Sequence, residues 1–277
     1  MKSKKTLLTA TAVAIFLCSC TTETIRVSDE VSTREYGFTG ISSLNVATDF
    51  KAYVRFSDNE EHVSITANEN IFSKIRIYQE GDRLTVKLKN NINLKGKETL
   101  NLFITMREIT DFKVSTDAAI YLDDPLNAGS VTLDMSTDGY FEGDITADDF
   151  DFRASSDSDA ELYLDAVDVN LNLSTGAKLE GEMYADFTRA RLSSDSRVEV
   201  FGKMNELDAD LTTDSRFGDY GLEVEDLVIS LSADSDGYFT VNETIDVTAN
   251  TDSRLFYKGD AEIIRQHLSS DGRVIKK

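Results

Sequence analysis

Apolar and polar residues alternate along much of the chain, and beyond residue 110 the same alternation returns about every 19 residues. In each copy three mostly apolar positions, spaced two residues apart, precede a short polar stretch. The last of these three positions holds Val114, Met135, Ala154, Leu173, Leu192, Leu211, Leu231, Ala249 and Leu268. A period of two indicates a strand with one buried face. The nine copies therefore predict nine equivalent strands.

The polar stretch that follows each strand is a short signature: two small, mostly hydroxyl-bearing residues, then Asp or Gly. Its third position holds Asp117, Asp138, Asp157, Gly176, Asp195, Asp214, Asp234, Asp252 and Asp271. Gly reaches left-handed backbone angles freely, and Asp tolerates them, so both residues favour a corner. Because Gly176 stands in the same place, the pattern indicates a backbone requirement first. The alternative is a ladder of carboxylates that binds calcium or another cation.

Two copies of the signature are doubled, and each is interpreted as a two-residue insertion at its corner. On that interpretation, the position three residues past the signature Asp or Gly is apolar in every copy, when the two doubled copies are counted from their second Asp. The doubled copies are also the weak metal candidates of the chain: Asp157, Asp159, Asp234 and Asp236. No other cofactor is expected.

A 19-residue coil cannot bury its inner face alone, but stacked coils can. The sequence therefore predicts an all-β fold, a right-handed parallel β-helix, with each strand paired in parallel to the next coil. Each coil should hold a strand, a corner, a second strand and a return segment such as residues 143–148. Nine coils at ~4.8 Å give a column about 43 Å tall. These repeats are assigned to residues 111–277.

Residues 36–110 are also β-like but lack the 19-residue repeat, and we expect an N-terminal β-hairpin-rich part. Gly81 supplies the positive φ of one tight hairpin. The only helical pattern is a short one at residues 70–74. Strands are expected at residues 43–47, 51–56, 62–67, 74–79, 83–89 and 99–105.

The first 19 residues have the composition of a secretory signal peptide: Lys2, Lys4 and Lys5, then a short apolar run. Its end resembles a bacterial lipoprotein signal, in which Cys20 follows a small residue and is lipidated. Residues 20–35 would then tether the domain to the membrane. Ordinary cleavage without a lipid is the alternative.

The formal net charge of −21 argues against nucleic acid as a partner. No cysteine follows Cys20, and no phosphate loop or nucleophile elbow occurs. The histidines, His62 and His267, have no accompanying catalytic motif. The enzyme alternative is a polysaccharide lyase or glycosidase. Such enzymes build their clefts from long loops between coils, and the regular coil length of this chain argues against such loops.

One outward column of the repeat carries Arg153, Asn172 and Arg191 on successive coils. This face is a solvated surface, or it is a candidate face for a glycan or an extended envelope protein.

Residues 38–274 resemble the head GIN domain family of putative auto-transporter adhesins. The resemblance rests on the recurring corner, on the opening Phe38-Thr39-Gly40-Ile41 and on Arg83-Leu84-Thr85-Val86, with Asp replacing Gly at most corners. It implies a β-helical, secreted or lipid-anchored envelope protein without catalytic residues. The expected function is a non-enzymatic, adhesin-like binding module on an outer-membrane lipoprotein, facing the periplasm or the outside. A structural or regulatory envelope module is a further alternative.

Overall fold

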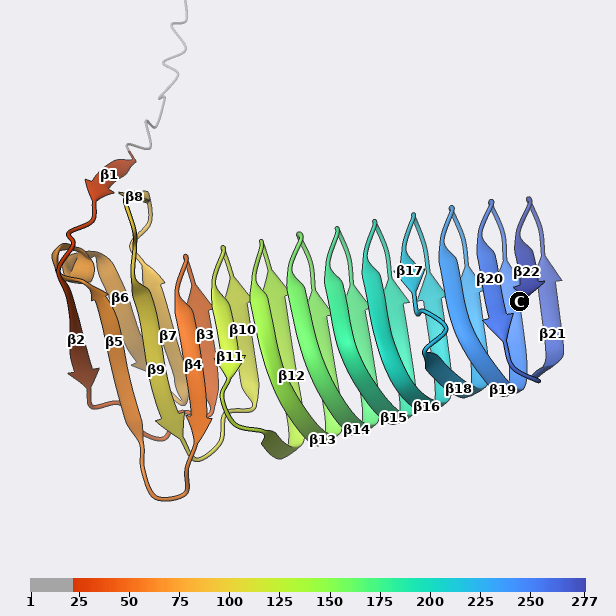
Figure 1. Ribbon diagram of the computed structural model, residues 1–277, viewed down its shortest axis with the longest axis horizontal. Helices are drawn as coiled ribbons and strands as arrows, with labels where there is room; N and C mark the ends of the chain where they lie inside the picture. The colour runs from red at the N-terminus through yellow and green to blue at the C-terminus, as the bar shows by residue number, and fades with distance from the viewer. Residues whose placement is uncertain (1–21) are drawn as a thin grey trace, which may run out of the picture.

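The computed structural model describes residues 22–277 and shows a β-solenoid of about nine turns with ~19 residues per turn (Figure 1). The predicted parallel β-helix is confirmed, because the strands of the stack pair in parallel with those of the neighbouring coils. The strands of the stack are β3 (Ser43–Ala47), β4 (Lys51–Phe56), β10 (Asp111–Ser115), β11 (Ala119–Leu122), β12 (Leu126–Ser136), β13 (Tyr140–Ala154), β14 (Asp159–Leu173), β15 (Lys178–Leu192), β16 (Arg197–Leu211), β17 (Arg216–Phe217), β18 (Leu222–Leu231), β19 (Asp236–Ala249), β20 (Arg254–Lys258), β21 (Glu262–Leu268) and β22 (Arg273–Lys276).

Each central coil is one continuous strand closed by a tight corner. The predicted return segment at residues 143–148 is therefore wrong as a separate element, because it lies inside β13. The long strands bend instead of breaking. We call the segments that lead into the corners sheet 1, and the segments that leave them sheet 2. The corners lie in a row along the upper edge of Figure 1.

The signature forms these corners, as predicted, through two successive left-handed residues. Thr116 and Asp117 have φ of 59° and 58°, and the same pair of positive angles recurs in every copy. Gly176 has φ of 76° at the Asp position. In several corners the N–H of the fourth residue donates to the carbonyl of the first, as from Ser196 to Ser193 at 3.4 Å. Two positive φ values in a tight turn are the pattern of type I′.

The corners also continue the hydrogen-bond ladder from coil to coil. The N–H of Asp157 donates to the Thr175 carbonyl at 2.9 Å, and that of Gly176 donates to the Ser194 carbonyl at 2.9 Å. The small residue after the corner is buried. At four corners it is a serine whose hydroxyl donates to a carbonyl of the preceding coil, as Ser196 does to Leu173 at 3.1 Å. The buried hydroxyl of Ser158 has no such partner among the described residues. Backbone groups at the corners are thus satisfied without any bound ion.

The Asp49→Asn variant is expected to melt roughly 1–2 °C higher than the parent at pH 7. Partial burial, and then the charges of Asp117 and Glu98, raise the pKa of Asp49. Ionisation therefore opposes folding, and this penalty is absent below the ordinary Asp value and grows as pH rises through the raised value. Asn tolerates the left-handed angle of 61° at this corner. Calorimetry should show the difference at pH 7 and none at about pH 3, below the ordinary carboxyl pKa. An equal difference at both pH values would contradict the assignment.

The interpretation of the doubled signatures as insertions is wrong. Phe141 pairs with Ala160, and Phe217 pairs with Gly237, so the coils stay in register through both corners. An error of two residues keeps every side chain on the same face, and a period of two cannot reveal it. Length differences are absorbed elsewhere. One example is a bulge that leaves Ile264 61% exposed, outside the apolar column expected for it.

The N-terminal part continues both sheets. β3 and β4 already form a coil, with a corner at Thr48 and Asp49. The predicted hairpin at Gly81 is confirmed, since it joins two antiparallel strands. The predicted helical stretch is a 3-10 helix. The elements outside the stack are β1 (Glu23–Arg26), β2 (Val31–Tyr36), β5 (His62–Asn68), η1 (Glu69–Lys74), β6 (Ile75–Glu80), β7 (Arg83–Leu88), β8 (Ile92–Lys95) and β9 (Leu100–Met106).

One continuous apolar core runs between the two sheets. Inside it aromatic side chains meet across neighbouring coils, as Phe112 and Phe141 do with ring centroids 5.3 Å apart. In residues 22–277 no helix is long and apolar enough to cross a membrane.

Candidate functional site

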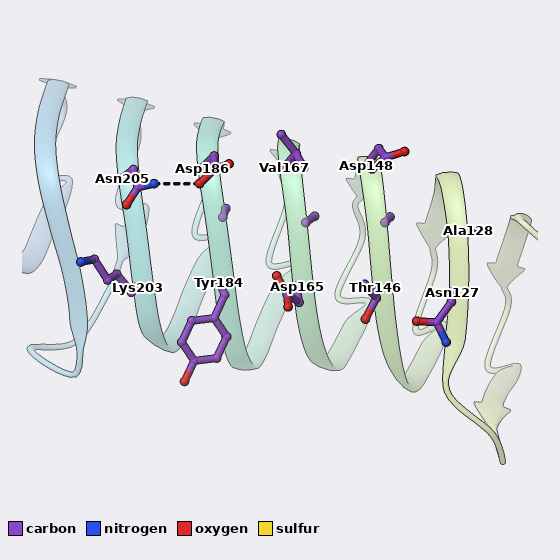
Figure 2. A pocket seen from close by; sticks show the side chains of 13 residues that line it. Asn127, Ala128, Thr146, Asp148, Asp165, Val167, Tyr184, Asp186, Lys203 and Asn205 are labelled. Carbon is purple, nitrogen blue, oxygen red and sulfur yellow. Dashed lines mark hydrogen bonds between the residues drawn. The ribbon is translucent and has the colours of Figure 1, made fainter.

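A shallow groove crosses five successive coils where the long strands bend (Figure 2). We call it the axial groove, because it runs from coil to coil along the solenoid axis. Its volume is about 470 Å³. Residues from β12, β13, β14, β15 and β16 line it. At ~4.8 Å per coil, five coils make a groove about 19 Å long.

Three rows of register-matched residues build the axial groove. The central row consists of small side chains: Ala128, Ala147, Ala166 and Ala185. The row on one side is mostly polar: Asn127, Thr146, Asp165, Tyr184 and Lys203. The residues on the other side are Asp148, Val167, Asp186 and Asn205. The sequence analysis missed this site. The recurrence of Ala at 19-residue steps could have revealed it, if the copies had been aligned at the bend.

Two polar side chains of the axial groove, Tyr184 and Lys203, are held by neighbours outside it. The Tyr184 hydroxyl donates to Glu182 at 2.6 Å, and this hydrogen bond raises the pKa of the phenol. The Lys203 ammonium lies 2.6 Å from Glu225, and that hydrogen bond raises the pKa of Lys203. Tyr184 therefore stays a neutral phenol and Lys203 a cation near neutral pH. The groove offers fixed hydrogen-bonding groups and an aromatic ring.

The face predicted from the sequence lies on sheet 1, close to the corners. Arg153 pairs in register with Asn172, and Asn172 with Arg191, so the three residues stand side by side on successive coils. Hollows of about 360 and 340 Å³ lie on either side, and both are lined by Asn172 and Ser174. Arg153 is 3.3 Å from Asp134. The structure thus brings the predicted residues together beside two shallow hollows; whether they bind a ligand stays a prediction.

The four weak metal candidates lie in two corners that are four coils apart. Asp236 is bound by the Arg254 guanidinium through two contacts, at 2.8 and 2.9 Å. Partial burial is the main cause that raises the pKa of Asp159. Within residues 22–277 no group of three or more His, Cys, Asp or Glu side chains could hold a metal ion. The candidate lipidation site, Cys20, lies outside the described residues.

The fold and grooves define an elongated β-solenoid with shallow, repetitive surfaces. A family model described as "Putative auto-transporter adhesin, head GIN domain" matches residues 37–182 and 163–261. These matches span most of the chain, so the chain belongs to that family.

Several solved structures share the fold at low sequence identity. A putative adhesin from Parabacteroides merdae is 15% identical, with a TM-score of 0.71, over 92% of this chain and 99% of that one. A putative adhesin from Parabacteroides distasonis is 15% identical, with a TM-score of 0.69, over 92% and 100%. A protein from Parabacteroides distasonis described as a putative lipid binding protein is 16% identical, with a TM-score of 0.66, over 92% of this chain and 100% of that one. At this identity the likeness shows the fold alone. Among curated proteins none matches the chain.

Proposed function

We propose that the protein is a non-enzymatic, adhesin-like binding module of the cell envelope that holds an extended glycan in the axial groove. The observation that carries this proposal is the repetition of the groove from coil to coil. A linear polymer that lies along the axis meets the same arrangement of small central residues and polar sides at each step. The family's adhesin description agrees with an envelope or surface location.

The groove's shape supports binding of a polymer more than binding of a small metabolite. It is long and shallow, and its central residues are small, so a chain can lie in it without a deep cavity. Tyr184 offers a ring that is 38% exposed, and aromatic rings contribute strongly to contacts with partly apolar ligands. The neighbouring Asp186 accepts a hydrogen bond from Asn205 at 2.7 Å, which fixes its orientation (Figure 2).

The Tyr184→Ala variant is expected to lower the affinity for a glycan selected on an array by about tenfold, since loss of one such aromatic contact costs over 1 kcal/mol. The matched control is Tyr163→Ala. Its ring lies 6.2 Å from that of Tyr184 and is 40% exposed, but it does not line the axial groove. Calorimetric titration measures both variants. Equal losses for the two variants would sink the assignment to this groove.

A carbohydrate-active enzyme is the alternative, because three carboxylates line the same groove: Asp148, Asp165 and Asp186. Incubation of the protein with the bound polysaccharide, followed by product analysis, separates the two functions. Product formation that is lost in the Asp165→Asn variant would replace the binding module with an enzyme.

We also propose that Cys20 anchors the protein in the outer membrane, which would make it a lipoprotein. The support is the sequence alone: a positive start, a short apolar run, and a small residue before Cys20. The anchor would hold the solenoid at a membrane surface. The expected tether of residues 20–35 is shorter than the sequence suggested, because residues 23–26 and 31–36 form strands that pair with β8 and β5.

A further inference from the structure

The coils nearest the C-terminus carry a cluster of cations and aromatic rings on sheet 2. We call it the cation–aromatic face, and it consists of Arg216, Tyr220, Tyr238, Arg254, Phe256 and Lys258. These residues come from β17, β19 and β20 and from the segment that follows β17 (Figure 1). Arg216 and Arg254 both neighbour Asp236 in the register, and Tyr238 pairs with Phe256.

The cations of this face rest against rings. The Arg216 guanidinium lies 4.3 Å from the centre of the Tyr238 ring, and the Lys258 ammonium 4.1 Å from that of Tyr220. The rings support one another, with Tyr238 stacked on Phe256 at 4.8 Å. A cation above an aromatic ring is attracted to it and loses little of its hydration on the other side. The arrangement fixes the positions of the two charges.

These charges lack carboxylate partners in a chain with an excess of carboxylates. The chain has 50 acidic and 29 basic residues. Yet within residues 22–277 neither Arg216 nor Lys258 has a carboxylate oxygen within ion-pair distance, whereas Arg254 takes both oxygens of Asp236. The Nε atom of Arg216 is buried without an acceptor in the same part of the chain. An external anion would therefore meet Arg216 through the other N–H donors of its guanidinium.

We propose that the cation–aromatic face binds an anionic polysaccharide through its carboxylate or sulfate groups. Cations already cover the ring faces of Tyr220 and Tyr238, so recognition through ion pairs is favoured over stacking of sugar rings. Arg216 and Lys258 lie two coils apart, about 10 Å along the axis, and Lys258 lies further along its strand than Arg254, which is level with Arg216. A linear polyanion that crosses the face obliquely can therefore meet both at once. The corner residues Asp214 and Asp252 lie two residues before Arg216 and Arg254. Their negative charges disfavour an anion near the corners and favour its binding on the side of Lys258. The inference rests on the proposed function for its ligand class, a glycan, but places it on a different sheet surface.

The test is a titration of the full chain with polygalacturonate, with dextran sulfate as the sulfated probe and neutral dextran as the uncharged one. The double variant Arg216→Gln/Lys258→Gln is expected to bind the anionic probes about tenfold or more weakly, because both charges that would bond to the probe are removed. The control Arg76→Gln/Lys51→Gln changes the net charge equally at exposed residues of the N-terminal part and should bind within about twofold of the parent. Binding should weaken with added salt.

Three outcomes would overturn the proposal: binding of neither anionic probe, equal losses in both double variants, or a lower melting temperature with unchanged affinity. The last would mean that the cations only stabilise the fold. Lys258→Gln alone is the variant to measure if the double variant unfolds, because Lys258 is exposed. Neutral glycans and Tyr184→Ala test the axial groove separately, so failure there leaves the polygalacturonate result unaffected.

Discussion

The Gly181→Ala variant is expected to lose about 2–5 kcal/mol of unfolding free energy, a large part of the stability of a typical domain. Gly181 has φ of 129°, which side-chain-bearing residues rarely adopt. A Cβ atom there would lie 1.9 Å from the Leu162 carbonyl oxygen in the neighbouring strand. Because the obstacle is backbone in a hydrogen-bonded ladder, it cannot rotate away. Urea unfolding measures the change.

The matched control is Gly176→Asn. Gly176 also has a positive φ, 76°, but it sits in a corner where Asp occupies the same position in the other coils. The atom nearest to a Cβ there is the Asp157 carboxylate oxygen at 2.2 Å, and that side chain can turn aside. We expect a loss below about 1 kcal/mol, since Asn tolerates left-handed angles. A loss below about 1 kcal/mol for Gly181→Ala as well would show that the carbonyl of Leu162 can move.

The Cys20→Ala variant is expected to lose membrane attachment altogether. Each buried CH₂ of an acyl chain contributes ~0.8 kcal/mol to membrane binding, and two chains anchor a protein stably. Without the thiol no acyl group can be attached, and the acidic domain offers little attraction to an anionic membrane. Labelled palmitate should be absent from the variant, and the protein should leave the membrane fraction.

Cys18→Ala serves as the control for the same experiment. The bulky Leu17 precedes Cys18, whereas the small Ser19 precedes Cys20, which fits the cleavage position better. The Cys18→Ala variant should keep both label and membrane fractionation. Label that persists in Cys20→Ala would reject Cys20 as the anchor.

The coil and its corner could be predicted because both are local. A period of two fixes which residues face inward, and the positive φ pairs need Asp, Gly or small polar residues at two adjacent positions. The strand limits 43–47 and 51–56 agree with β3 and β4. The prediction failed where the sequence pattern cannot distinguish alternatives. Ala160 and Leu162 both point inward, so the pattern could not show which of them is level with Phe141.

The site was predicted only in part. Arg153, Asn172 and Arg191 could be placed in one row from the repeat alone, and the register confirms the row. The axial groove was not predicted because β13 to β16 continue through the bend without a break. Only an alignment of the copies at the bend would have shown the row of Ala residues. The cations on Tyr220 and Tyr238 were missed for another reason. They come from coils with irregular lengths, where β17 is followed by a break before β18.

The hydrogen bonds between successive corners allow the number of coils in the solenoid to change without loss of the remaining corner contacts. Each Asp or Gly N–H bonds only to the adjacent coil, so a coil added or removed between two corners leaves the remaining contacts intact. The axial groove lengthens or shortens by the same ~4.8 Å step. For the polymer binding proposed above, the number of coils between Asn127 and Asn205 would set how many units of the polymer are bound at once.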